Sequence, residues 1–224
     1  MPNALRVTLS SVASLAGFMV LLFAPAGTLD YWQGWLFLGV FAVVSLVPTL
    51  YLGRVDPATV DRRMHGGPTA ETRTVQKIVV VGIIVCFTGI LVLSSTDHRF
   101  GWSSVPAALS VLGAAMVAVG LGGAMLVVVQ NRYAAATITV EDGQPLVTSG
   151  LYGIVRHPMY SASVVMMIGM PLALGSYWAL LIVPVVLALL VIRILDEETM
   201  LREELAGYGD YMARVRYRLI PLAW

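Results

Sequence analysis

The sequence predicts an all-α, polytopic membrane helix bundle with about six spans, on three observations. First, 58% of the 224 residues are hydrophobic and 12% are charged, whereas a soluble domain has about 45–50% apolar and about 25% charged residues. Second, a topology with the N-terminus inside places all but one of the 14 Lys and Arg residues on the same side of the membrane. Third, five uncharged stretches are each long enough to cross a bilayer: 7–29, 31–53, 78–96, 100–131 and 157–192. An ordinary soluble globule, a disordered chain and a nucleic-acid binder are excluded.

The first two spans are predicted as a pair joined by a tight turn at 27–30. The aromatic run that follows, 31–35, is typical of the membrane interface. Span two then continues to about residue 52. After it, Asp56 is placed as a helix N-cap before Pro57, which predicts a short surface helix over 57–64.

Span three is predicted over 77–95, with 97–99 as a short outer loop, and span four over 104–130. Span four carries a stripe of small residues four apart, which favours close helix packing: Ala114, Ala118 and Gly122. The stretch 157–192 is too long for one span, because a helix of that length would reach about 54 Å against a hydrocarbon core of about 30 Å. It therefore predicts a hairpin turning at Gly175-Ser176, with arms of about 18 residues each.

The placement of basic residues predicts the orientation. With the N-terminus inside, only Arg99 lies on the outer side, and the positive-inside rule then places both termini in the cytoplasm. We expect an integral protein of the inner or plasma membrane. Residues 1–130 would form a four-span membrane bundle, and 131–224 a cofactor-binding linker, helical hairpin and tail integrated with it.

Chemistry is expected at the cytoplasmic edge. No span carries a charged residue near its middle, so the usual sign of an ion pathway is missing. A metal site is not expected, because the single cysteine, Cys86, lies within a span and the three histidines, His65, His98 and His157, lie on different loops. The remaining polar residues concentrate in 131–160 and 193–221.

The first polar segment is a linker that leads into the hairpin. Residues 137–140 are β-prone and 141–143 read as a turn. Pro158 suits the first turn of the following helix, so Arg156 and His157 would lie beside unpaired backbone N–H groups and form an anion site. Anchoring of these two residues at the lipid headgroups explains their position equally well.

The second polar segment continues the last span. Arg193 and Glu197 are four apart and share a helix face. A solvated amphipathic helix explains the charges of 202–204, but Arg193 lies nearest the apolar boundary and needs a partner. The basic and aromatic tail, 207–221, suits the headgroup layer.

These segments together resemble the isoprenylcysteine carboxyl methyltransferase family, in its bacterial, integral-membrane form. The resemblance covers about residues 131–224. It rests on Gly-x-Tyr-x-x-x-Arg-His-Pro-x-Tyr at Gly150–Tyr160, a hairpin, Arg-x-x-x-Glu-Glu-x-x-Leu at Arg193–Leu201, Gly-Tyr-x-x-Tyr at Gly207–Tyr211, and Arg-Leu-Ile-Pro at Arg218–Pro221.

The resemblance implies S-adenosyl-L-methionine as cofactor, held between the linker and the hairpin. Arg193 and Glu197 would be catalytic, with Arg193 clamping the acceptor and Glu197 fixing the Arg193 guanidinium. Arg156 and His157 suit the cofactor's carboxylate, Glu197 or Glu198 its ammonium group, and Tyr152 or Tyr160 its adenine or sulfonium. The expected cofactor-binding residues are Gln144, Pro145, Leu146, Val147, Tyr152, Arg156, His157, Pro158, Met159, Tyr160, Glu197 and Glu198.

The expected function is methyl transfer to a lipophilic acceptor that comes from the bilayer, with membrane lipids as partners and no nucleic acid. The resemblance favours O-methylation of a carboxylate, which needs no base. Phospholipid N-methylation and thiol S-methylation are alternatives in which Glu197 would take the acceptor's proton. A sterol-reductase-like, NADPH-dependent oxidoreductase and a non-enzymatic membrane scaffold are the further alternatives.

Overall fold

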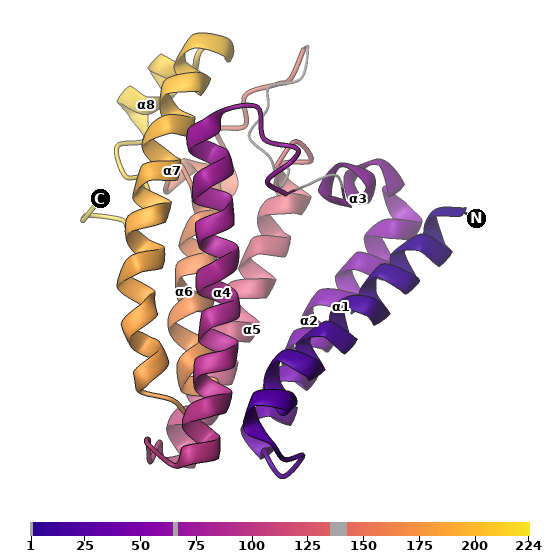
Figure 1. Ribbon diagram of the computed structural model, residues 1–224. Helices are drawn as coiled ribbons and strands as arrows, with labels where there is room; N and C mark the ends of the chain where they lie inside the picture. The colour runs from indigo at the N-terminus through magenta and orange to yellow at the C-terminus, as the bar shows by residue number, and fades with distance from the viewer. Residues whose placement is uncertain (1, 65–66, 135–142) are drawn as a thin grey trace.

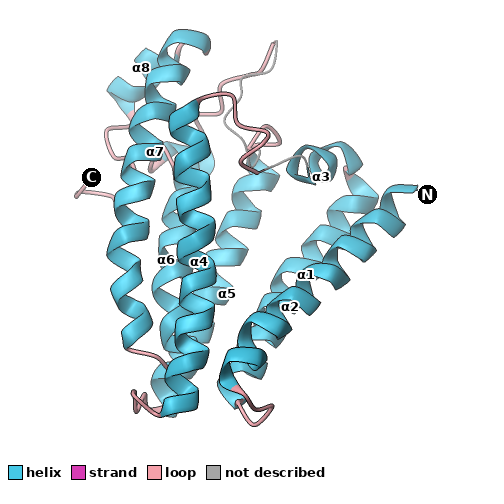
Figure 2. Ribbon diagram, viewed as in Figure 1, coloured by secondary structure: helices cyan, strands magenta, loops and turns pink. Residues whose placement is uncertain are grey.

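The computed structural model describes residues 2–64, 67–134 and 143–224, and every regular element in these ranges is helical (Figure 2). Two short 3₁₀ helices, η1 (Gly150–Gly153) and η2 (Trp178–Ile182), precede α6 and α7. The α-helices are α1 (Pro2–Ala26), α2 (Trp32–Val55), α3 (Pro57–Met64), α4 (Thr74–Phe100), α5 (Ala107–Gln130), α6 (Pro158–Ala173), α7 (Val183–Glu204) and α8 (Tyr208–Arg214).

The expected polytopic helix bundle is confirmed. Five helices in the described ranges are long and apolar enough to cross a membrane, the last of them running from Trp178 through α7. The expected sixth span is α6, whose 16 residues reach about 24 Å. The hairpin turns where the sequence predicts, since Gly175 has a φ of 73° and follows the end of α6. Its arms are unequal, because α6 is shorter than the expected 18 residues.

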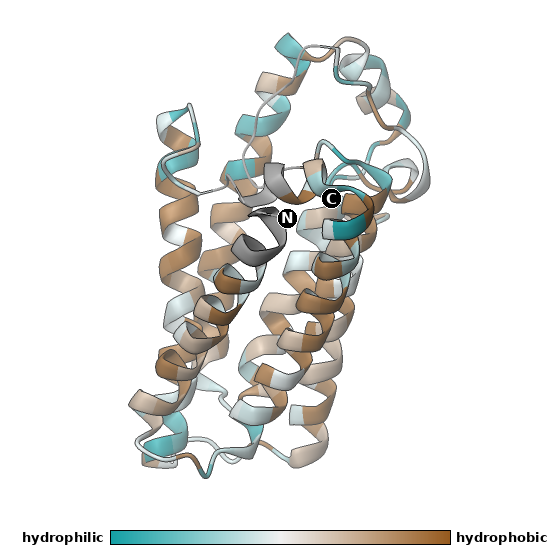
Figure 3. Cartoon of the chain, turned by 90° about the vertical axis from the view of Figure 1, so that its right-hand side faces the viewer, coloured by the Kyte–Doolittle hydropathy of each residue, from teal (hydrophilic) through white to brown (hydrophobic). Residues whose placement is uncertain are grey.

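The helices form two groups (Figure 1). Helices α4 to α7 make one bundle, while α1 and α2 pack together and diverge from that bundle toward the end where both chain termini lie. Hydrophobic residues cover the length of the helices, and hydrophilic residues gather at the two ends (Figure 3). The end that carries both termini also carries α3, α8 and the tail (Figure 1).

The packing of α6 determines where space remains in the bundle. Helix α6 packs extensively against α5 and only lightly against α7. Glycines allow this close approach: a Cβ on Gly120 would lie 2.7 Å from the Ala162 carbonyl oxygen, and one on Gly169 would lie 2.7 Å from that of Gly113. Close packing of span four was expected along Ala114, Ala118 and Gly122. The close approach to α6 occurs at Gly113 and Gly120, whereas Gly122 has no atom within 4 Å of its Cβ position.

Two polar features at the other end of the bundle differ from the sequence expectation. Tyr31 was assigned to the interfacial belt, but it is 1% exposed and its hydroxyl donates to the Leu174 carbonyl oxygen at 2.7 Å. Asp97 was assigned to a loop, but it lies in the last turn of α4 and accepts hydrogen bonds from Ser103 and Ser176. These contacts tie α2 and α4 to the hairpin turn, so burial outweighs the interfacial preference.

The short surface helix is confirmed as α3. Asp56 accepts hydrogen bonds from the backbone N–H and the hydroxyl of Thr59, at 3.3 and 2.9 Å, and so caps the helix as expected. The expected β-prone segment 137–140, the first two residues of the 141–143 turn and His65 lie outside the described residues.

Candidate active site

A cavity of about 340 Å³ lies among α4, α6, α7, α8 and the linker. This volume falls within the range of about 300–1,000 Å³ that small-molecule sites occupy. Of the residues expected from the sequence at the site, all but Glu198 line it: Gln144, Pro145, Leu146, Val147, Tyr152, Arg156, His157, Pro158, Met159, Tyr160, Arg193 and Glu197. The linker and the hairpin therefore do meet around one space.

One face of α7 forms a continuous wall of the cavity. Val186, Leu190, Arg193, Glu197 and Leu201 all line it, at spacings of three and four residues that keep side chains on one helix face. The wall is apolar at Val186 and Leu190, ionic at Arg193 and Glu197, and apolar again at Leu201 and at Leu205, which follows α7. The cavity thus has two apolar zones that flank one ionic zone.

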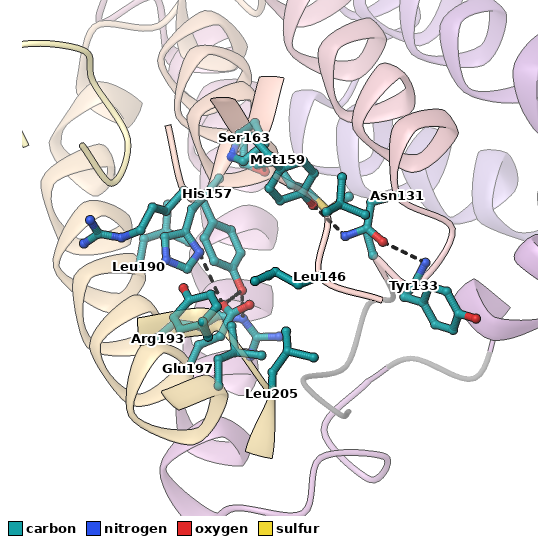
Figure 4. A pocket seen from close by; sticks show the side chains of 18 of the residues that line it. Asn131, Tyr133, Leu146, His157, Met159, Ser163, Leu190, Arg193, Glu197 and Leu205 are labelled. Atoms are coloured by element: carbon teal, nitrogen blue, oxygen red, sulfur yellow. Dashed lines mark hydrogen bonds and ion pairs between the residues drawn. The ribbon is translucent and has the colours of Figure 1, made fainter. Parts of the chain in front are cut away.

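A hydrogen-bond chain crosses the ionic zone. The Tyr160 hydroxyl donates to Glu197 Oε2 at 2.7 Å and accepts from Arg193 Nε at 2.9 Å. His157 stacks on the Tyr160 ring, with 5.6 Å between the ring centroids. Figure 4 shows His157, Arg193 and Glu197 on one side of the cavity, with Asn131 and Tyr133 on the other.

Arg193 is held by residues that the sequence did not suggest. Its Nη2 donates to Glu71 Oε1 at 2.9 Å, and its Nη1 donates to Gln76 Oε1 at 2.7 Å. Both partners are buried and come from the start of α4 and the segment before it. The expectation that Glu197 fixes this guanidinium is corrected: Glu197 reaches Arg193 through the Tyr160 hydroxyl, and Glu71 forms the ion pair.

Glu198 lies behind the cavity wall and is buried in a cluster of basic groups. It accepts from Arg156 Nε at 2.7 Å and from Arg218 Nε at 3.0 Å, and His157 Nε2 lies 3.2 Å from its Oε1. These contacts occupy both carboxylate oxygens. Adjacent acids in the sequence thus have different surroundings, because successive helix residues point about 100° apart.

The start of α6 is covered by the tail. The backbone N–H groups of Arg156 and His157 donate to the carbonyl oxygens of Tyr217 and Arg218, each at 2.9 Å. Arg156 Nη1 also donates to the Val215 and Arg216 carbonyl oxygens. The expected anion site is therefore replaced by protein acceptors, and the tail, expected among the headgroups, packs on the helix start.

The linker side of the cavity is organised around Tyr152. Its hydroxyl accepts from Asn131 Nδ2 at 3.1 Å, and its carbonyl oxygen accepts from the Tyr211 hydroxyl at 2.8 Å. Burial raises the pKa of Tyr152, an effect that the Asn131 hydrogen bond opposes. Asn131, Tyr208 and Tyr211 line the cavity but were not among the expected site residues, although Tyr208 and Tyr211 belong to the Gly-Tyr-x-x-Tyr pattern.

Among the described residues, the acids around the cavity are paired with arginine except at Glu197. Arg193 is compensated by Glu71, and Glu198 by Arg156 and Arg218. In the described ranges, no Lys or Arg lies within ion-pair distance of Glu197, and its nearest basic atom is His157 Nδ1 at 3.8 Å. A carboxylate that faces a cavity in this way favours a ligand with positive charge.

Comparison with known proteins gives one family. The family model described as phospholipid methyltransferase matches residues 108–207, from the start of α5 to the residue before α8. That family belongs to the isoprenylcysteine carboxyl methyltransferase superfamily, so the match supports the resemblance at that level and supports a membrane methyltransferase. The bacterial subtype is not distinguished by it. No curated protein matches the chain.

Proposed function

We propose that this protein is an S-adenosyl-L-methionine-dependent methyltransferase acting on a lipophilic acceptor at the membrane. The observation that carries the proposal is the zoned wall of α7, which places an ionic centre between an apolar zone inside the bundle and an apolar zone at α8. The match to a phospholipid methyltransferase family supports the same reaction type.

The residues of the cavity suit this cofactor. S-adenosyl-L-methionine would supply a methyl group activated on a positively charged sulfonium. Glu197 gives the ionic zone the negative charge that attracts such a cation, and Tyr160, which lines the same cavity, adds an aromatic ring that would do the same. Displacement reactions depend on alignment and on the exclusion of water, and the surrounding Met159, Leu146 and Leu190 side chains make the cavity largely apolar.

The acceptor is proposed to come from the lipid. Val80, Ile83 and Ile84 line the cavity from α4, and Met167 from α6, so the inner zone is apolar. Ile84 is also 50% exposed. This inner zone could hold an acyl or prenyl chain while the polar end of the acceptor reaches Arg193 and Glu197.

The charge distribution supports an amine as the reacting group over the carboxylate that the family resemblance favours. A carboxylate acceptor would meet Glu197, while the nearby guanidinium of Arg193 is already paired with Glu71. An ammonium group would be attracted by Glu197, which would accept one of its protons and so free the nitrogen lone pair. That lone pair would form the N–C bond to the methyl group while the methyl–sulfur bond breaks, and S-adenosylhomocysteine would leave. The Tyr160 hydroxyl and Arg193 would hold the Glu197 carboxylate in place.

The site is proposed to face the cytoplasm. It lies at the end of the bundle that carries both termini, α3 and the tail (Figure 1). The basic residues of the connecting segments concentrate at this end, which by the positive-inside rule is the cytoplasmic one. The cofactor would thus reach the cavity from the aqueous side and the acceptor from the bilayer.

Methyl transfer from labelled cofactor into defined vesicles tests the proposal. Protein reconstituted with phosphatidylethanolamine should incorporate label that survives mild alkali, because an N-methyl bond is stable to base whereas a methyl ester releases methanol. Glu197→Gln is the matched inactive control. Alkali-labile label on an added prenylated or fatty acid would favour the carboxylate, and absence of both S-adenosylhomocysteine binding and label transfer would overturn the proposed function.

A further inference from the structure

Tyr208, the first residue of α8, has a buried hydroxyl without a protein partner. The residue is 3% exposed and lines the cavity. Its hydroxyl oxygen has no hydrogen-bond partner among the described residues. By contrast, the hydroxyls of Tyr152, Tyr160 and Tyr211 on the same cavity all have one. A buried polar group left without a partner is destabilising, so a ligand is the natural source of the missing bond.

The surroundings of Tyr208 suit a flat, apolar ring. Leu205, Tyr208 and Tyr211 form a buried cluster against which Leu146 and Leu201 pack. Gly207 has a φ of 79°, and this turn brings α8 back over the linker, where a Gly207 Cβ would lie 3.8 Å from Leu146 Cδ2. The outer apolar zone of the cavity is therefore an aromatic and aliphatic compartment. Its Tyr208 hydroxyl has no hydrogen-bond partner among the described residues.

The order of zones along α7 indicates which part of a ligand this compartment takes. Leu205 directly follows α7 and comes eight residues after Glu197. Eight helical residues rise about 12 Å along the helix axis. The reacting centre must lie near Glu197 and Tyr160, next to the acceptor zone. Of the two arms that the cofactor sulfur carries, the charged amino-acid arm suits the ionic zone, and the nucleoside arm suits the aromatic and aliphatic compartment.

We propose that Tyr208 donates a hydrogen bond to a ring nitrogen of adenine and so makes the compartment between α8 and the linker the base-recognition site. The inference rests on the proposed function, since it assumes an adenosyl cofactor. It concerns a residue outside the family match, which ends at Gly207. Burial, and then the charges of Glu198 and Glu197, raise the pKa of Tyr208, so the phenol keeps the proton that it would donate.

Binding of S-adenosylhomocysteine and of its 1-deaza, 3-deaza and 7-deaza adenine analogues tests the proposal. Each analogue lacks one ring nitrogen, and the detergent-solubilised protein can be titrated with each by calorimetry. The wild type should bind S-adenosylhomocysteine about tenfold more tightly than one of the three analogues, which is the effect of one hydrogen bond of about 1.4 kcal/mol. Tyr208→Phe should bind that analogue and S-adenosylhomocysteine equally well.

Tyr31→Phe is the matched control. It removes a buried tyrosine hydrogen bond at the other end of the bundle, to the Leu174 carbonyl oxygen, so it should lower the melting temperature of the ligand-free protein and keep the wild-type preference between ligands. Tyr208→Phe should leave the ligand-free melting temperature unchanged or higher, because it removes a buried hydroxyl that has no protein partner.

Two results would overturn the inference while the proposed function stands. One is a Tyr208→Phe protein that still distinguishes the analogues as the wild type does. The other is an equal loss of affinity for all four ligands together with a lower ligand-free melting temperature, which would make the hydroxyl a structural group. Failure of the wild type to bind S-adenosylhomocysteine would remove the proposed cofactor and this inference with it.

Discussion

Glu71 and Arg193 form a buried ion pair of 2.9 Å although 122 residues separate them in the sequence. The pair joins the segment before α4 to the ionic zone of the α7 wall. Because Arg193 in turn donates to Tyr160, which donates to Glu197, the position of the Glu197 carboxylate depends on a residue outside the cavity lining.

Replacing Glu71 should therefore destabilise the protein. We expect Glu71→Ala to lower the free energy of unfolding by about 3–5 kcal/mol, since it leaves the Arg193 guanidinium buried without its carboxylate. Thermal unfolding in detergent micelles measures this. Arg73→Ala is the control, because its ion pair with Asp196 is 38% exposed on the arginine side and its loss should cost about 1 kcal/mol or less. Equal losses in the two variants would contradict the assignment.

We expect Glu197 to be needed for the reaction and Glu198 for the stability of the fold. Glu198→Gln removes the charge shared by Arg156, His157 and Arg218, so we expect a loss of about 3–5 kcal/mol in stability. Glu197→Gln faces the cavity and has no Lys or Arg partner in the described ranges. It should change stability by about 1 kcal/mol or less and abolish methyl transfer.

The melting temperature and the affinity for S-adenosylhomocysteine are measured on the same preparations of both variants. Glu197→Gln should melt near the wild type and bind the ligand more weakly. If Glu198→Gln melts as the wild type does, or if Glu197→Gln alone is strongly destabilised, the division of roles is wrong.

The sequence predicts some residues of the site and not others. It predicts the ionic part of the α7 wall, because Arg193 and Glu197 follow the helical spacing and charged residues are scarce enough for these two to stand out. It does not predict the role of Glu71, because a contact between a loop and a distant helix leaves no periodic signal. Tyr31 and Asp97 were misassigned for the same reason: interfacial preference and loop signals are local, while the burial of both residues comes from contacts with the hairpin turn.

The Tyr160 hydroxyl should matter for turnover more than for cofactor binding. Tyr160→Phe removes the hydrogen bonds to Glu197 and from Arg193, and bonds to charged groups are worth about 1.5–3 kcal/mol. We expect methyl transfer to fall about 10- to 100-fold, the rate equivalent of that energy. Affinity for S-adenosylhomocysteine should change by a factor of about three or less, or about 0.7 kcal/mol.

Label transfer into vesicles and calorimetric titration of the same Tyr160→Phe preparation separate the two effects. Ser163→Ala is a suitable control, since Ser163 also lines the cavity but its hydroxyl donates only to the Met159 carbonyl oxygen within α6. A Tyr160→Phe variant with wild-type turnover would remove the hydroxyl from the mechanism.

The tyrosines of α8 should make the protein sensitive to alkali. Burial raises the pKa of both Tyr208 and Tyr211. Below about pH 10, the pKa of an unperturbed tyrosine, both phenols are protonated in the folded and unfolded states, and stability does not depend on them. Above it, the unfolded chain loses these protons while the folded protein keeps them. The unfolded state then binds fewer protons, so the free energy of unfolding falls with rising pH.

Each such tyrosine should contribute a decrease of about 1.4 kcal/mol per pH unit, until the pH reaches the raised pKa of the folded state. Melting temperatures recorded from pH 8 to pH 11 for the wild type and for Tyr208→Phe test this. Because the substitution removes one ionisable phenol and leaves Tyr211 in place, the variant should lose stability less steeply above pH 10 and follow the wild type below it. Parallel curves over the whole range would mean that the Tyr208 phenol ionises as freely in the folded protein as in the unfolded chain, which its burial in the α8 compartment opposes.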